Sequence, residues 1–346
     1  MLQQTSLYRK YRSRTFDEII GQDQIVKVLR GSLDLGNISH AYVFAGSRGT
    51  GKTSIARIIA HELGCTPSDI YEIDAASNRG IDDVRDIRIS VETVPFESKH
   101  KVYIIDEVHM LTKEAFNALL KTLEEPPSYV VFILATTELE KIPETVLSRC
   151  QVFQFKKPNQ KTLKDLVLKV SKKEGYSIDP SSGELIAMLA DGSFRDSLGI
   201  LQKVLSFSKD KKISAQEVEL VTGAPKGKLV NAFLSAVADG DMHSAVRALH
   251  EARDSNVEMK TFLTLMLQKM RFVLLLKYAK EMKSEIAGEV SEEDFEFLAE
   301  LSQKTESKIN SKTVDAFLIA ESQLSHAFIP ELPIELALMR LLGQDN

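Results

Sequence analysis

The sequence contains only two cysteines, no tryptophan and no long apolar run. Cys65 and Cys150 lie far apart, and two thiols are too few for a disulfide-stapled scaffold or for a zinc site with four cysteine ligands. The longest apolar stretches, such as Val130 to Ala135, fall far short of the roughly 20 residues that a membrane-spanning helix needs. We therefore predict a cytoplasmic protein that works in a reducing compartment and does not contact a membrane.

The sequence also lacks an excess of basic residues. It has 44 lysines and arginines against 49 aspartates and glutamates, which gives a net charge of −5. Such a chain repels nucleic acid slightly as a whole, so a DNA-binding surface would have to be local or built by several subunits together. Hydrophobic residues make up 43% and charged residues 27%, as in an average globular protein.

The length of 346 residues favours two or three domains. Residues 1–156 alternate short apolar runs with helix-like stretches, which is typical of an α/β domain with a mostly parallel sheet. Residues 157–222 are expected to form a small helical domain, and residues 223–346 an all-helical one. The expected strands are Ala41–Ala45, Ile70–Ile73, Val102–Ile105, Val130–Ala135 and Val152–Phe155.

The third segment carries apolar residues at helical spacing. Phe262, Met266, Met270 and Val273 lie on one face of a predicted helix. Such a face is buried either in the core of its own domain or in a contact between subunits, and the pattern leaves both alternatives open.

A glycine-rich loop lies between the first expected strand and a helix-like run. It fits the phosphate-loop pattern, in which backbone N–H groups surround the β-phosphate of a nucleotide at a helix N-terminus. Lys52 is then expected to reach the β and γ oxygens, and the Thr53 hydroxyl to ligate Mg²⁺. The expected nucleotide-binding residues of this loop are Gly46, Ser47, Arg48, Gly49, Thr50, Gly51, Lys52, Thr53 and Ser54.

Two acids follow another apolar strand, and two threonines follow the next one. Asp106 fits the second contact to Mg²⁺, and Glu107 fits the residue that polarises the water attacking the γ-phosphate. Thr136 and Thr137 could hold that water or sense the γ-phosphate. They could equally cap the segment after the strand.

Two arginines stand where a phosphate could be contacted. Arg149 lies just before the last expected strand, where it could reach the nucleotide of a neighbouring subunit or form a surface ion pair. Arg195 lies in the first turn of a helix that Ser193 is expected to cap. A cation there opposes the helix dipole, so either an anion lies in front of it or an acid beside it forms an ion pair.

Taken in order, these motifs resemble the AAA+ clamp-loader ATPases, P-loop NTPases of DNA replication, and in particular their bacterial branch. The resemblance is strongest over residues 7–200, and Leu332–Leu338 is similar to the end of the helical collar domain of this family. The stretches that carry it are Leu7–Arg12 with Thr15–Phe16 and Gly21–Gln22, Asp74–Asn78, Asp106–Leu111 and Phe116–Pro127.

The resemblance implies an AAA+ ATPase domain, a helical lid domain and a helical collar that joins subunits. It also implies a motor subunit that binds and hydrolyses ATP with Mg²⁺. Other copies of the chain and the delta and delta-prime subunits would join it, and together they would open the beta sliding clamp and load it on primed DNA.

The resemblance also assigns roles to individual residues. Thr137 becomes the first sensor, Arg149 a finger acting in trans, and Arg195 the second sensor. Tyr8, Arg12 and Ile20 would line the adenine pocket. Arg85 and Lys121 match positions that contact the DNA backbone, although both could be ordinary solvated helix charges.

The chain departs from the family pattern in three places. No four-cysteine module lies between the phosphate loop and Asp74, so zinc is not expected. The chain ends at Asn346, and without a further tail we expect no contacts to the polymerase or the helicase. Ser13 stands where a proline is usual, which could loosen the N-terminal nucleotide contact.

Other functions remain to be distinguished. A catalytically weak scaffold resembling delta-prime would have lost the phosphate-loop chemistry, which Lys52 and Glu107 argue against. A small subunit of replication factor C would share the ATP site but not the bacterial stretches. DNA-directed DNA polymerase activity would belong to the holoenzyme, since no pair of metal carboxylates is arranged here for nucleotide addition.

Overall fold

The computed structural model describes residues 5–208 and 210–343. The chain divides into two compact units. Unit 1 comprises Met1–Thr162 and Gly192–Asp196, and unit 2 comprises Leu163–Asp191 and Ser197–Asn346. The outer ends of the first and third predicted domains, residues 1–4 and 344–346, lie outside the described residues.

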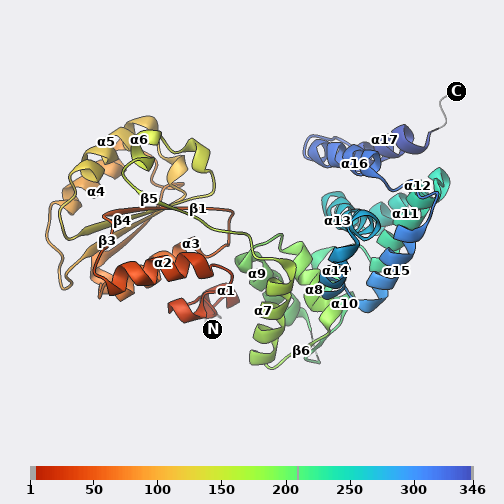
Figure 1. The fold of residues 1–346 in the computed structure, drawn as a ribbon, viewed down its shortest axis with the longest axis horizontal. Helices are drawn as coiled ribbons and strands as arrows, with labels where there is room; N and C mark the ends of the chain where they lie inside the picture. Colours follow the sequence, from red (N-terminus) through yellow and green to blue (C-terminus); the bar gives the residue numbers. More distant parts are fainter. Residues whose placement is uncertain (1–4, 209, 344–346) are drawn as a thin grey trace. The chain divides into compact units, whose positions relative to one another are not determined.

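Unit 1 is built around five parallel strands in the order β2-β3-β4-β1-β5 (Figure 1). All five predicted strands are confirmed to within two residues. The elements are α1 (Leu7–Lys10), η1 (Phe16–Glu18), α2 (Asp23–Asp34), β1 (Ala41–Ala45), α3 (Lys52–Glu62), η2 (Pro67–Asp69), β2 (Ile70–Asp74), α4 (Ile81–Val91), β3 (Lys101–Asp106), η3 (Val108–Met110), α5 (Lys113–Glu124), β4 (Val130–Thr136), η4 (Leu139–Lys141), α6 (Glu144–Leu147) and β5 (Gln151–Gln154).

Helices cover both faces of this sheet, as its continuous apolar strands predict. Helices α4, α5 and α6 lie on one face, and α2 and α3 on the other (Figure 1). Alternate residues of β1 point to the two layers: Val43 packs with residues of α4 and α5, and Phe44 with residues of α2 and α3. Because the strands are parallel, their carboxyl ends meet at one edge, where ligands bind in folds of this type.

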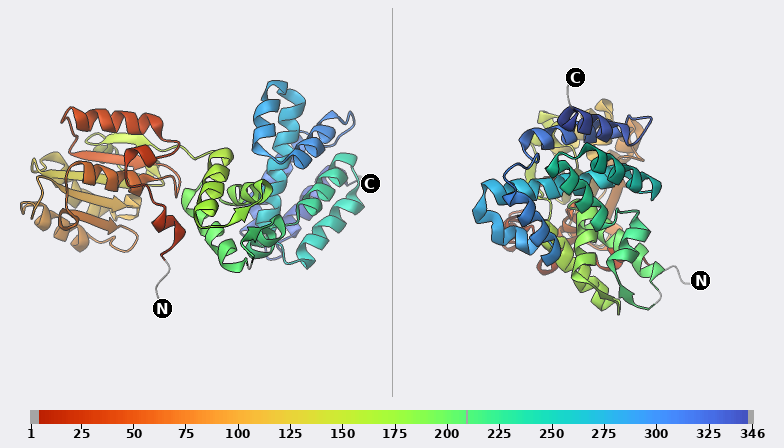
Figure 2. Two further views of the ribbon diagram at one scale, coloured as in Figure 1. Left: turned by 90° about the horizontal axis from the view of Figure 1, so that it is seen from below. Right: turned by 90° about the vertical axis from the view of Figure 1, so that its right-hand side faces the viewer.

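Unit 2 consists of helices and one two-stranded parallel ladder, β6 with β7. Helices α11 and α12 lie side by side, as do α16 and α17 (Figure 2). Two helices, α7 and α9, begin in unit 1 and continue into unit 2. The elements are α7 (Gln160–Lys173), β6 (Ser177–Ile178), α8 (Pro180–Leu189), α9 (Phe194–Phe207), β7 (Lys212–Ile213), α10 (Ala215–Thr222), α11 (Gly227–Asp239), α12 (Met242–Asp254), α13 (Met259–Tyr278), η5 (Lys280–Met282), α14 (Lys283–Glu289), α15 (Glu292–Gln303), α16 (Ser311–Leu324) and α17 (Leu332–Leu342).

The apolar face predicted around Phe262 lies in the core of unit 2. Phe262, Met266, Met270 and Val273, all on α13, are buried among residues of the other helices of this unit. Of the two alternatives, the structure therefore shows the internal core for this face. The division of the chain into three domains stays a prediction.

Candidate active site

The phosphate loop lies directly after β1, as the sequence predicts, and α3 begins at Lys52. Two of its glycines are required by close contacts. A side chain at Gly46 would meet the Phe155 carbonyl oxygen at 2.6 Å, and one at Gly49 would meet Ser193 Oγ at 2.0 Å. Both also have positive φ, at 149° and 74°, where other residues are strained. The loop backbone is thereby held close to neighbouring chain segments.

The Lys52 side chain folds over this loop. Its ammonium donates hydrogen bonds to the carbonyl oxygens of Gly46, at 2.6 Å, and Ser47, at 3.0 Å. Lys52 is only 5% exposed, and burial lowers the pKa of its ammonium, while the carboxylates of Glu107 and Asp106 oppose that shift. A buried cation therefore lies beside two acids at the carboxyl edge of the sheet.

The structure brings the predicted acids and hydroxyls together in pairs. Thr53 Oγ1 donates to Asp106 Oδ2 at 2.9 Å, which joins the start of α3 to the end of β3. Thr137 Oγ1 donates to Glu107 Oε2 at 3.1 Å, which joins the segment after β4 to the segment after β3. Five side chains thus meet at the carboxyl ends of three adjacent strands, β3, β4 and β1: Lys52, Thr53, Asp106, Glu107 and Thr137.

The pair of Thr53 and Asp106 has the chemistry of a magnesium site. Hydroxyl and carboxylate oxygens are ligands that Mg²⁺ accepts, and Mg²⁺ is usually held by one or two protein groups, with water and phosphate oxygens completing its shell. Among the described residues, no group of three or more His, Cys, Asp or Glu side chains could hold a metal ion. The donor set fits a Mg²⁺ ion that is shared with a nucleotide rather than one held by protein alone.

The residues predicted for the adenine pocket and the second sensor also lie in unit 1. Arg195 stacks over the ring of Tyr8, with its guanidinium carbon 4.9 Å from the ring centroid. Arg12 is half-buried, and its pKa is lowered by burial and by the neighbouring Arg57. Ile20 is 40% exposed. Arg195 and Tyr8 therefore form a cationic and aromatic contact.

The segment with Arg195 contacts the phosphate loop itself. The Phe194 N–H donates to the Gly49 carbonyl at 3.0 Å. Ser193 Oγ accepts from the Asp196 N–H at 3.1 Å, so the predicted helix cap at Ser193 is confirmed. This places the N-terminus of α9 against the loop.

Arg149 is ion-paired within the chain. Its Nη2 lies 2.7 Å from Glu124 Oε1 at the end of α5, and its Nη1 donates to the Thr145 carbonyl at 2.6 Å. About one third of the Arg149 side chain is exposed. The ion pair that the sequence left open is therefore present, and a trans-acting role remains a prediction.

The two predicted DNA contacts lie on neighbouring helices, outside the group at the sheet edge. Arg85 on α4 is exposed and forms a 2.7 Å ion pair with Asp82. Lys121 on α5 is also exposed. Helices α4 and α5 pack against each other, so both positions belong to one layer of unit 1.

Two residues at this site were missed by the sequence reasoning. Gln22 is buried, and its amide bridges the carbonyls of Thr50, at 3.5 Å, and Lys156, at 2.8 Å. His109 contacts the segments that follow β3 and β4. Both belong to stretches that carry the family resemblance, and that was the only signal in the sequence that could have found them.

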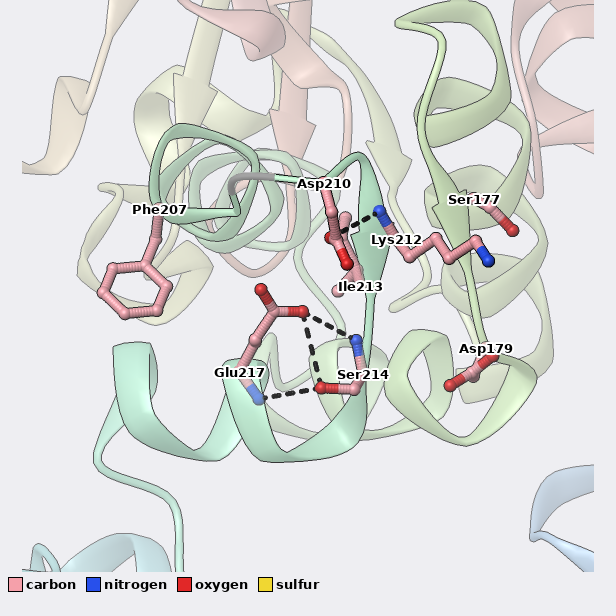
Figure 3. Close-up of a pocket in the computed structure, with 8 residues that line it drawn as sticks. All are labelled: Ser177, Asp179, Phe207, Asp210, Lys212, Ile213, Ser214 and Glu217. Atoms are coloured by element: carbon pink, nitrogen blue, oxygen red, sulfur yellow. Dashed lines mark hydrogen bonds between the residues drawn. The ribbon is translucent and has the colours of Figure 1, made fainter.

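A surface pocket in unit 2 contains none of the predicted site residues (Figure 3). Its polar groups serve local structure: the Lys212 N–H donates to Asp210, and the Ser214 N–H to Glu217. We assign it no catalytic role. Its lining residues are Ser177, Asp179, Phe207, Asp210, Lys212, Ile213, Ser214 and Glu217.

Two protein-family models match this chain. Residues 213–345 match the model described as DNA polymerase III subunits gamma and tau domain III. Residues 67–159 match the model described as DNA polymerase III, delta subunit. The first match lies in unit 2 and the second in unit 1.

Curated relatives match along nearly the whole chain. DNA polymerase III subunit tau of Bacillus subtilis is 36% identical over 97% of this chain and 63% of its own length. Its counterpart in Escherichia coli is 33% identical over 97% of this chain and 55% of its own length. The gamma/tau subunit of Mycoplasma pneumoniae is 38% identical over 74% of this chain and 41% of its own length. The chain thus spans less than two thirds of the length of each of these relatives.

Solved structures support the fold. The Holliday junction branch migration motor RuvB of Thermotoga maritima superposes with a TM-score of 0.53 at 24% identity. The match covers 66% of this chain and 79% of the other. At this identity the likeness shows a common fold alone. No described helix is both long enough and apolar enough to cross a membrane.

Proposed function

This chain belongs to the family of DNA polymerase III gamma and tau subunits, the clamp-loader AAA+ proteins, and we propose that it is an ATP-driven motor subunit of a bacterial clamp loader. In this role it binds and hydrolyses ATP together with other copies of itself and with delta and delta-prime subunits. The complex opens the beta sliding clamp and loads it on primed DNA.

The observation that carries the proposal is the meeting of five side chains at the carboxyl edge of the sheet. Backbone N–H groups of the loop and the buried Lys52 ammonium provide positive charge for the phosphates of ATP. Thr53 and Asp106 would hold Mg²⁺, which, when bound, neutralises negative charge on the phosphate oxygens. Glu107 directly follows Asp106 in the sequence, where it can orient a water molecule against the γ-phosphate.

Neighbouring residues complete the site. Thr137 holds the Glu107 carboxylate and can exchange this hydrogen bond for one to the water or the γ-phosphate. Tyr8, Arg12 and Ile20 would hold the base, and Arg195, at the helix N-terminus beside Gly49, would contact the phosphates. Arg149 would leave Glu124 and reach the nucleotide of an adjacent subunit, where it neutralises charge that develops in the transition state.

Partner contacts in the proposal follow from the family. Arg85 and Lys121 lie on adjacent helices and are exposed, so they can contact the DNA backbone from one side of unit 1. An overall charge of −5 gives no general attraction for DNA. The positive surface would therefore come from several subunits set side by side.

Nucleotide binding is the first property to test, with Lys52→Ala and a fluorescent ATP analogue in the presence of Mg²⁺. Loss of a charge-assisted hydrogen bond costs about 1.5–3 kcal/mol, so we expect affinity to fall by about 10- to 100-fold. Lys27→Ala is the matched control, since Lys27 is exposed on α2. Equal affinity of wild type and Lys52→Ala, with both folded, would contradict the assignment of this site.

A further inference from the structure

His109 lies on η3, between the segments that follow β3 and β4, and its side chain is only 7% exposed. Both ring nitrogens contact residues at the end of β4 or just after it. Nδ1 lies 3.1 Å from Thr136 Oγ1, and Nε2 lies 3.1 Å from Glu138 Oε1. A carboxylate accepts hydrogen bonds and does not donate them, so Nε2 carries the hydrogen in the contact to Glu138. The ring is thus fixed at both ends.

The partners of His109 are themselves held. Thr136 is fully buried at the end of β4, and its Oγ1 accepts the Glu138 N–H at 3.0 Å. The other carboxylate oxygen of Glu138 lies 2.7 Å from Lys141 Nζ. The imidazole therefore contacts two residues, Thr136 and Glu138, that are themselves held by hydrogen bonds and an ion pair at the end of β4 and the start of η4.

The Glu107 carboxylate lies against this fixed ring. Glu107 Oε2 is 3.5 Å from His109 Nδ1 and accepts a hydrogen bond from Thr137 Oγ1 at 3.1 Å. The same oxygen is thus bounded by a hydroxyl and an imidazole, which restricts where the carboxylate can point.

The backbone of Glu107 also needs support. Its φ of 50° and ψ of 43° lie in the left-handed region, which costs a residue with a side chain about 1–2 kcal/mol. Two hydrogen bonds hold this conformation: the Glu107 N–H donates to Asp106 Oδ1 at 3.1 Å, and the Met110 N–H donates to the Glu107 carbonyl at 2.9 Å. Strained conformations persist where the surroundings determine them, and His109 forms part of those surroundings.

We propose that His109 is a positioning residue for Glu107: its imidazole, fixed by Thr136 and Glu138, holds the Glu107 carboxylate in the direction needed to orient water for ATP hydrolysis. His109 itself touches neither ATP nor the water. The inference rests on the proposed function, because the role of Glu107 belongs to that function.

Removal of the ring should therefore reduce turnover and leave nucleotide binding intact. A correctly placed general base contributes about 10²- to 10⁴-fold to a rate, and loss of its support forfeits part of this. For His109→Ala in the complex assembled with delta, delta-prime, beta clamp and primed DNA, we expect kcat to fall about 10- to 100-fold. KM and ATP affinity should stay within about twofold, since an interaction that acts only in the transition state changes kcat.

Three further variants separate positioning from a general structural role. His109→Asn keeps a polar group near the place of Nδ1 and should regain most of the lost kcat, with the same thermal unfolding midpoint as His109→Ala. His61→Ala, on the exposed side of α3, is the matched histidine control and should behave as wild type. In a double-mutant cycle, His109→Ala should have almost no effect once Glu107→Gln is present, because it acts through Glu107.

Several outcomes would overturn the inference. If His109→Ala keeps full kcat while Glu107→Gln abolishes it, His109 does not position Glu107, although the proposed function stands. Additive effects of the two substitutions in the cycle would show a structural role instead. The same conclusion would follow if His109→Ala and His109→Asn lost kcat equally and both had a lower unfolding midpoint. If neither wild type nor any mixture hydrolyses ATP, the proposed function fails and the inference fails with it.

Discussion

Asp69 offers a quantitative test of how unit 1 is held together, through the substitution Asp69→Asn. This carboxylate lies at the end of η2 and is fully buried. It accepts three backbone N–H groups of one loop, from Phe96 at 2.6 Å, Glu97 at 3.0 Å and Ser98 at 2.9 Å. It therefore ties the segment before β2 to the segment before β3.

The magnitude follows from the pKa of Asp69. Burial alone would raise this pKa, but the hydrogen bonds from the loop outweigh burial and lower it from 3.8 to about 2. Each pKa unit corresponds to about 1.4 kcal/mol, so the ionised carboxylate contributes about 2–3 kcal/mol to the free energy of unfolding. Because the folded-state pKa is the lower one, this contribution is complete above about pH 5 and is lost as the pH falls towards 2. Near pH 3 about half of it remains.

Urea unfolding followed by tyrosine fluorescence measures this effect, since six of the eight tyrosines lie in residues 1–162. At about pH 7, Asp69→Asn should lower the free energy of unfolding by about 2–3 kcal/mol. The exposed Asp34 at the end of α2 provides the control, and Asp34→Asn should change stability by less than about 0.5 kcal/mol. The difference between wild type and Asp69→Asn should shrink as the pH falls from about 4 to about 3.

Two results would refute this reasoning. The first is a loss in Asp69→Asn no larger than that in Asp34→Asn at neutral pH. The second is a loss of the expected size that does not change in acid, because it would then arise from packing and not from the ionised carboxylate.

Two further predictions concern the assembled complex. Arg149→Ala should leave ATP affinity within about twofold but lower ATPase by about 10³-fold. Little loss of stability is expected, because its ion pair with Glu124 is partly exposed to solvent. An equal loss of ATP binding would contradict a role in trans. Arg85→Ala combined with Lys121→Ala should weaken DNA-stimulated ATPase, and lower salt should restore it, as for lost phosphate contacts. A defect that salt does not change would make these residues structural.

Much of unit 1 could be predicted from local sequence patterns. The strands β1, β3 and β4 are nearly continuous apolar runs, and such runs between helices indicate a sheet that is buried on both faces. The phosphate loop and the acids at the end of β3 could be predicted because they lie at the carboxyl ends of strands, and parallel strands bring these ends to one edge. The adjacency of Lys52, Thr53, Asp106 and Glu107 thus follows from topology.

Contacts between distant segments could not be predicted in this way. The Gln22 amide meets Lys156, 134 residues along the chain, and Arg149 meets Glu124. No periodicity marks such pairs, because each depends on where two loops come to rest after the sheet has formed. The same holds for His109, whose neighbours come from the end of a different strand. Residues that support the catalytic groups therefore became visible only in the structure.

The measurement that tests the central claim most directly is the steady-state ATPase of the purified chain, alone and then mixed with delta, delta-prime, beta clamp and primed DNA. We predict a slow basal rate that rises strongly, by up to about 10³-fold, only with the full mixture, because Arg149 of one subunit completes the site of another. ATP binding and stable assembly without any stimulation would contradict a motor subunit and would favour a nucleotide-gated scaffold.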